Sequence, residues 1–157
     1  MQKVYLETTI PSYLTSRPSR DIVIAGRQEV TREWWETRRD EFMLFVSPYV
    51  LDESAKGDPE IAKKRMQLLE SIPVLAENEE VLTLAQVLID GEIIPEKAAI
   101  DALHISIATY HKMNLLLTWN CAHIANATNI RRIERSMSAR GFESPIICTP
   151  DELMEGE

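Results

Sequence analysis

Short apolar runs alternate along this chain with longer segments in which apolar residues recur at helical spacing. The runs are bounded by polar residues, glycine or proline, which is typical of strands buried in a sheet. Residues 72–75 are the weakest candidate, because Pro73 cannot donate a ladder hydrogen bond and would confine them to a sheet edge. The strands predicted in this way are residues 4–6, 42–46, 72–75, 115–117 and 145–148.

Helix-start signals precede several of the segments between these runs. Asp21, Ser47 and Asp58 are residue types that cap helix N-termini, and Pro48 and Pro59 stand at first helical positions. The predicted helices begin near residue 10, span residues 21–39, 48–57, 59–71, 77–89, 95–112 and 125–140, and end with a short helix after residue 149. Strands that alternate with helices indicate an α/β fold of three layers, with a central, mainly parallel sheet covered on both faces.

The helix predicted at residues 95–112 has almost no polar face and should therefore be buried. Asp101 lies within it, and an ionised carboxylate among apolar residues costs free energy unless a cation or hydrogen-bond donors compensate it. The sequence allows three explanations of Asp101. It belongs to a functional site, it pairs with an Arg or Lys inside the fold, or it lies on a thin polar stripe of the helix with His104 and His111.

The length of 157 residues fits one domain, and we predict a single domain over residues 1–157. The first ten residues lack the layout of a secretory signal, and no stretch approaches the roughly 18 apolar residues of a membrane span. Two cysteines, Cys121 and Cys148, are too few for a disulfide scaffold. We therefore expect a cytoplasmic protein that does not enter a membrane and whose cysteines remain thiols.

The formal net charge of −8 argues against a protein that coats nucleic acid generally, because such affinity comes largely from Lys and Arg. A phosphate-bearing partner would require clustered basic residues, or carboxylates neutralised by a divalent cation. Basic residues do cluster at positions 63–65 and at Arg131, Arg132 and Arg135. Such clusters are also typical of solvated helix faces.

Candidate chemistry gathers where the predicted strands end. In open parallel α/β sheets the functional crevice lies beyond the carboxyl ends of the strands, and Glu7, Thr8 and Asn120 follow two of them. Glu53 and Asp101, on predicted helices, would flank the same crevice. Three carboxylates from distant parts of the chain would then meet, and oxygen ligands of this kind suit Mg²⁺ or Mn²⁺.

Each candidate also has a structural explanation. Glu7 is equally consistent with a solvated loop residue, and Asn120 and Thr8 with turn or cap residues. Glu53 competes with the adjacent Asp52, but one residue turns a side chain by about 100° around a helix, so only one of the two faces the crevice well. We prefer Glu53.

A zinc site is a further alternative. Its candidate ligands are Cys121, His123, His104 and Asp101. Their spacing is not that of a standard zinc site.

Four segments together resemble the ordered motifs of a PIN domain, and more narrowly of the VapC-like toxins of toxin–antitoxin pairs. They are YLETTIPSYL at residues 5–14, SPYVLDE at 47–53, DALHISIAT at 101–109 and LLTWNCAHIANA at 116–127. The resemblance covers nearly the whole chain and implies a three-layer PIN-like fold. It also implies a ribonuclease dependent on Mg²⁺ or Mn²⁺, an RNA substrate, a small antitoxin partner and a homodimer.

The resemblance assigns a role to each candidate residue. The metal would be held by Glu7, Glu53 and Asp101, and water would be oriented by Thr8 and Asn120. His104 would contact the metal ligands without binding the metal itself. The sequence departs from the family pattern twice, by Glu instead of Asp at position 7 and by an amide at Asn120 where many members carry a fourth Asp. The competing interpretation is a catalytically weakened PIN-like module that binds RNA or protein.

Overall fold

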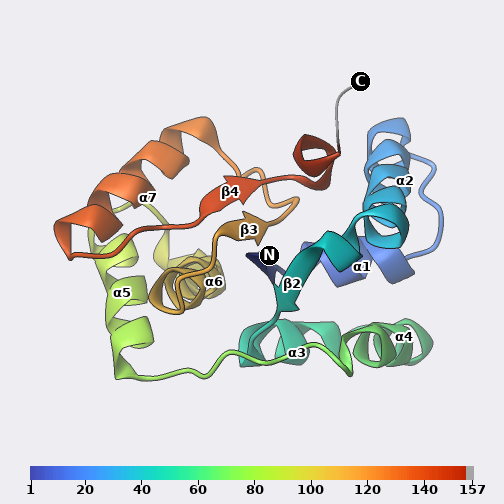
Figure 1. Ribbon diagram of the computed structural model, residues 1–157, viewed down its shortest axis with the longest axis horizontal. Helices are drawn as coiled ribbons and strands as arrows, with labels where there is room; N and C mark the ends of the chain where they lie inside the picture. Colours follow the sequence, from blue (N-terminus) through green and yellow to red (C-terminus); the bar gives the residue numbers. More distant parts are fainter. Residues whose placement is uncertain (155–157) are drawn as a thin grey trace.

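A parallel sheet of four strands forms the centre of the computed structural model, which describes residues 1–154 (Figure 1). The strands are β1 (Gln2–Leu6), β2 (Phe42–Phe45), β3 (Leu115–Leu117) and β4 (Ile146–Cys148). They lie in the order β2-β1-β3-β4, and each neighbouring pair is parallel. All carboxyl ends of the strands therefore lie at one edge of the sheet.

Helices cover both faces of this sheet. In Figure 1, α5, α6 and α7 lie on one side of the strands and α1 and α2 on the other, while α3 and α4 lie beyond β2. The helices are α1 (Thr9–Thr15), α2 (Ile22–Thr37), α3 (Pro48–Ser54), α4 (Pro59–Leu69), α5 (Glu79–Asp90), α6 (Ala99–Tyr110) and α7 (Ala127–Ala139). Three 3-10 helices complete the described structure: η1 (Arg39–Glu41), η2 (Glu96–Ala98) and η3 (Pro150–Leu153). The predicted three-layer α/β/α class is confirmed.

Side-chain caps fix several helix starts, as the sequence signals predicted. Asp21 accepts hydrogen bonds from the backbone N–H groups of two residues in the first turn of α2, and Asp58 does the same at α4. Ser47 caps α3, where Pro48 occupies the first turn. These bonds satisfy N–H groups that have no partner within the helix, which typically stabilises a helix by about 1 kcal/mol.

The core includes the sheet, α6 and helices on both sides of the strands, such as α1 with Ile10 and α2 with Trp34. Val4, Tyr5 and Leu6 of β1 are fully buried, and α6 packs on α5 with most of its residues hidden from solvent. Fully burying one large aliphatic side chain contributes about 1.5–3 kcal/mol, so the near-absence of a polar face on α6 is explained by its central position. The prediction that this helix is buried is confirmed.

Two predicted elements need correction. Residues 72–75 form no strand; they make one isolated bridge, in which Val74 pairs with Val46. The helix predicted at residues 95–112 is divided, because Ala98 adopts φ −111° and ψ 33° between η2 and α6. It also ends at Tyr110, since Lys112 adopts a positive φ of 58°, which is incompatible with a continuing helix.

No helix in residues 1–154 is both long enough and apolar enough to cross a membrane. Both cysteines are free thiols, with Cys121 exposed and Cys148 buried at the end of β4.

Candidate functional site

Glu7 is held rigidly at the carboxyl edge of the sheet. It directly follows β1, its backbone N–H donates to Leu117 of β3, and the residue is only 4% exposed. Its Oε1 atom accepts hydrogen bonds from the hydroxyl groups of Thr9 at 2.5 Å and Thr118 at 2.6 Å, and from the Thr9 backbone N–H at 3.2 Å. Oε2 has no donor among the described residues. One carboxylate oxygen is therefore fixed and the other remains available.

Glu53, on α3, is the second acidic group. Its Oε1 atom accepts a hydrogen bond from the Thr8 hydroxyl and lies 2.8 Å from His104 Nε2. Burial raises the pKa of Glu53, but the hydrogen bonds from His104 and Thr8, together with Coulombic attraction to His104 and Lys56, outweigh it, and the pKa lies below its usual value. The neighbouring Asp52 is exposed. Glu53, and not Asp52, therefore lies beside Thr8, just after the end of β1.

A buried chain of polar side chains lies behind Glu53. The Tyr5 hydroxyl is 2.6 Å from His104 Nδ1 and 2.7 Å from the Ser47 hydroxyl. In the neutral imidazole, Nε2 carries the proton shared with Glu53 and Nδ1 accepts from Tyr5. Burial raises the pKa of Tyr5 well above its usual value, so the phenol stays protonated and can act as that donor.

Asp101, on α6, is the third acidic group and is 9% exposed. Its Oδ2 atom lies 2.8 Å from His123 Nδ1, and the His123 backbone N–H donates to Asn120 Oδ1 at 3.1 Å. Asp101 precedes His104 by three residues, so both lie on one face of α6. The loop after β3 thus contacts α6 through His123 and Asp101. α6 also contacts Glu53, through His104.

A continuous series of contacts joins the three acidic groups around the carboxyl edge of the sheet. Glu7 contacts Thr118, whose hydroxyl accepts from the backbone N–H of Asn120, and Asn120 leads through His123 to Asp101. In the other direction Thr8, next to Glu7, contacts Glu53. The structure therefore connects all the candidate residues, although it does not place the three carboxylates in direct contact.

None of the three carboxylates forms an ion pair with Lys or Arg within residues 1–154. Asp101 is thus not paired with an Arg or Lys inside the fold, one of the explanations that its sequence context allowed. Each carboxylate uses one oxygen on protein donors and leaves the second without a donor in the described structure. Uncompensated oxygen ligands of this kind suit a hard divalent cation by donor type.

Across the described part of the chain, however, no three His, Cys, Asp or Glu side chains are grouped so that they could hold a metal ion as they stand. Glu53 and Asp101 each face a histidine instead. The same finding leaves the zinc alternative without a ligand group, since His104 and His123 are engaged by different carboxylates and Cys121 is exposed.

Sequence reasoning missed several partners of the candidate acids. They are Tyr5, Thr9, Ser47, Thr118 and, as the partner of Asp101, His123. Thr9 and Thr118 carried a usable signal, because each is a hydroxyl residue within three positions of the end of a predicted strand. The buried tyrosine in β1 was a second signal, since a buried phenol normally finds a hydrogen-bond partner.

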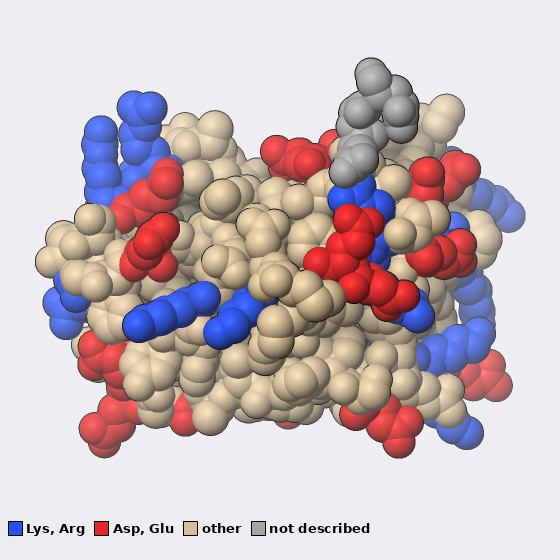
Figure 2. All heavy atoms as spheres, viewed as in Figure 1, with Lys and Arg blue, Asp and Glu red and all other residues tan. Residues whose placement is uncertain are grey.

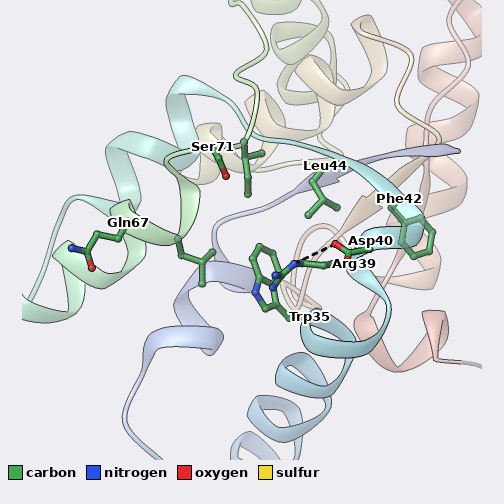
Figure 3. A pocket seen from close by; sticks show the side chains of 9 residues that line it. Trp35, Arg39, Asp40, Phe42, Leu44, Gln67 and Ser71 are labelled. Carbon is green, nitrogen blue, oxygen red and sulfur yellow. Dashed lines mark ion pairs between the residues drawn. The ribbon is translucent and has the colours of Figure 1, made fainter.

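A separate hollow lies between α2, β2 and α4 (Figure 3). The Arg39 guanidinium lies 4.7 Å from the centre of the Trp35 ring and pairs with Asp40 at 3.8 Å. Phe42 and Leu44 contribute apolar surface. None of the candidate acidic residues lines this hollow, so its depth does not bear on their chemistry.

No protein-family model matches the chain, and no curated protein matches it significantly. A chain in the crystal structure of VapBC2 from Rickettsia felis, bound to a DNA fragment from the promoter, matches with a TM-score of 0.60 and 16% identity, over 94% of this chain and 98% of that chain. A chain in the structure of VapBC-1 from nontypeable Haemophilus influenzae matches with a TM-score of 0.59 and 16% identity. The match covers 96% of this chain and 99% of that chain. The chain therefore has the PIN-like fold of VapC, as its sequence motifs predicted.

Proposed function

We propose that this chain is a ribonuclease dependent on Mg²⁺ or Mn²⁺ and the toxin component of a toxin–antitoxin pair. The observation that carries the proposal is the set of three carboxylates, Glu7, Glu53 and Asp101, which form no ion pair with Lys or Arg in residues 1–154 and are linked around the carboxyl edge of a PIN-like sheet. Buried or half-buried acids without a Lys or Arg partner are unusual in a structural role and frequent in metal-dependent sites.

The surrounding residues hold the acidic groups in place. Thr9 and Thr118 fix one oxygen of Glu7, and Thr8 and His104 fix one oxygen of Glu53. A divalent cation held by these acids and Asp101 would polarise a phosphate oxygen and lower the pKa of a water molecule. Because the ligands are not grouped as they stand, cation binding would require their side chains to rearrange.

Asn120 has a defined capacity for hydrogen bonding. Its Oδ1 accepts from the His123 backbone N–H, and no acceptor for its side-chain NH₂ is present among the described residues. Asn120 therefore has donors to offer to a phosphate or water oxygen, whereas the Asp of many PIN domains would accept. The Thr8 hydroxyl donates to Glu53 and keeps its lone pairs to orient water.

The partners follow from the same proposal. The two matching structures are VapBC complexes, which supports a small antitoxin as partner of this chain. RNA as the substrate and a homodimer as the assembly are implied by the PIN-like motifs. The longer side chain of Glu7 and the amide of Asn120 favour Mn²⁺ over Mg²⁺, since Mg²⁺ demands near-ideal octahedral geometry.

The direct test incubates the purified protein with structured RNA and Mn²⁺. We expect Asp101→Asn and Glu53→Gln to reduce cleavage at least about 100-fold, which corresponds to roughly 2.7 kcal/mol of transition-state stabilisation. Asp52→Asn is the matched control, because Asp52 is exposed and adjacent to Glu53. The ribonuclease assignment is wrong if the two site variants cleave as fast as the parent and the control.

One observation favours a second function, that of a PIN-like module which binds RNA or protein without cleaving. Glu53 and Asp101 each contact a histidine, and the ligands are not grouped for a metal ion in residues 1–154. This alternative predicts that the parent protein retains RNA in a binding assay while the RNA stays intact in the presence of Mn²⁺.

A further inference from the structure

The exposed face of α7 concentrates positive charge in a chain whose formal net charge is −8. Arg131, Arg132 and Arg135 are exposed, and together with Ala127 and Thr128 they line a shallow groove. Figure 2 shows Lys and Arg side chains projecting from the corner of the molecule over α7. Glu134 is the one acidic residue on this helix.

These arginines have no acidic partner in the described structure, unlike Arg17 and Arg39. Arg17 pairs with Asp58 and Arg39 with Asp40, whereas no carboxylate in residues 1–154 lies within 4.0 Å of an α7 arginine. Arg132 donates to the backbone carbonyls of Gly91 and Glu92, each at 3.2 Å, which anchors one edge of the groove. The Arg131 and Arg135 guanidinium groups remain available to an anion.

The groove begins beside the candidate site. α7 follows the loop that carries Asn120 and His123, and Asn129 in its first turn donates to the His123 backbone carbonyl at 2.9 Å. His123 in turn contacts Asp101. The positive end of the helix dipole, capped by Asn126, lies at the same end of the groove.

We propose that this groove binds the phosphate backbone of RNA that continues from the acidic crevice. The proposal rests on the proposed ribonuclease function and deepens it. Arg131 and Arg135 are four residues apart, about 6 Å along the helix, so one strand meets two guanidinium groups in succession. Guanidinium groups bind phosphate oxygens through paired hydrogen bonds, and such contacts fix the position of a nucleic acid without reading its sequence.

The composition of the groove favours RNA over an acidic protein. A protein interface is normally centred on buried aromatic or large apolar anchors. The groove offers none, since its non-arginine lining is Ala127 and Thr128. The groove also adjoins the loop that carries His123, which contacts Asp101, so a bound RNA strand could continue from the groove to the carboxylates.

The test measures binding and not cleavage. A fluorescently labelled single-stranded RNA is titrated with the full chain in EDTA at several salt concentrations, for the parent and for the double variant Arg131→Gln/Arg135→Gln. We expect the variant to bind on the order of 10-fold more weakly, and the slope of log K against log salt to fall by about 1.4, which is roughly 0.7 per lost phosphate contact. Circular dichroism verifies that α7 is retained.

The matched control is Lys63→Gln/Lys64→Gln, which removes the same charge from exposed positions on α4. The proposal is overturned if the arginine variant keeps the parental affinity and slope, or if the two double variants lose affinity equally. It is also overturned if poly-glutamate, and not RNA, binds in an arginine-dependent way. Arginine-dependent binding by a parent that never cleaves RNA supports the groove while contradicting the ribonuclease function, so the two failures are distinguishable.

Discussion

The imidazole of His104 lies 2.8 Å from the carboxylate of Glu53, although the two residues are 51 positions apart and the histidine side chain is fully buried. A buried imidazole needs a partner on each ring nitrogen, and Tyr5 supplies the second at 2.6 Å. The position of Glu53 thus depends on hydrogen bonds that begin inside β1, which links the folding of the core to the geometry of the acidic site.

Removal of the Tyr5 hydroxyl should destabilise the protein. In Tyr5→Phe, both the His104 ring nitrogen and the Ser47 hydroxyl lose a buried partner, so we expect the free energy of unfolding to fall by about 1–3 kcal/mol in urea titrations. Tyr110→Phe is the control, because no hydrogen bond of the Tyr110 hydroxyl is present in the described structure. Equal stability of the two variants would show that the buried chain contributes nothing.

The lowered pKa of Glu53 predicts a defined pH dependence of stability. Burial raises this pKa, but hydrogen bonds from His104 and Thr8 and Coulombic attraction to His104 and Lys56 lower it by a larger amount. The folded protein therefore holds the proton less tightly than the unfolded chain. The resulting stabilisation is present above the unfolded value of about 4.3 and is lost as pH falls through the folded value. The stability gap between the parent and Glu53→Gln should therefore shrink between pH 6 and pH 3. A gap that stays constant or widens contradicts the pKa direction.

Thr118 and Glu7 should be energetically coupled. The Thr118 hydroxyl donates to Glu7 Oε1 at 2.6 Å and accepts from the Asn120 backbone N–H at 2.9 Å. A double-mutant cycle of Thr118→Val and Glu7→Gln should give a coupling free energy of about 1–2 kcal/mol in unfolding experiments, because one bond is to a charged group. The control cycle combines Glu7→Gln with Thr83→Val, because Thr83 is an exposed threonine on a helix. Additive effects of the first pair would show that Thr118 does not hold Glu7.

Addition of Mn²⁺ should raise the melting temperature of the parent protein. An ion at about 100 times its dissociation constant adds roughly 2.7 kcal/mol of stability, which for a chain of this size is a rise of about 5–10 °C. The rise should be reversed by EDTA and absent in Asp101→Asn, but retained in Asp52→Asn. A rise that persists undiminished in Asp101→Asn places the ion elsewhere.

Local signals explain which parts of the fold were predictable from the sequence. The caps Asp21, Ser47 and Asp58 act on residues two or three positions away, so the starts of α2, α3 and α4 could be predicted closely. The predicted strand at residues 72–75 was wrong, because an edge strand forms only if several of its residues pair with the neighbouring strand. Here Val74 alone forms a bridge, with Val46.

The partners of the acidic residues required tertiary structure. Glu53 and Thr8 are separated by 45 positions, and Asp101 and His123 by 22, so no periodicity in the sequence relates them. The acids themselves were identifiable, because Asp101 stands in an apolar helix and Glu7 ends an apolar strand. Their hydrogen-bond donors depend on how β3, α3 and α6 pack together.

The two cysteines should differ sharply in reactivity. Burial raises the pKa of the Cys148 thiol to about 12, and the carboxylates of Glu152 and Asp151 add to the effect, whereas Cys121 is exposed. Alkylation requires the thiolate, and at pH 8 roughly one Cys148 in ten thousand would be in that form. Iodoacetamide should therefore add one group per folded chain, at Cys121, and a second in urea, as measured by mass spectrometry.

Cys121→Ser is the control and should remain unmodified until it is unfolded. Rapid labelling of that variant under native conditions would mean that β4 and η3 do not bury Cys148.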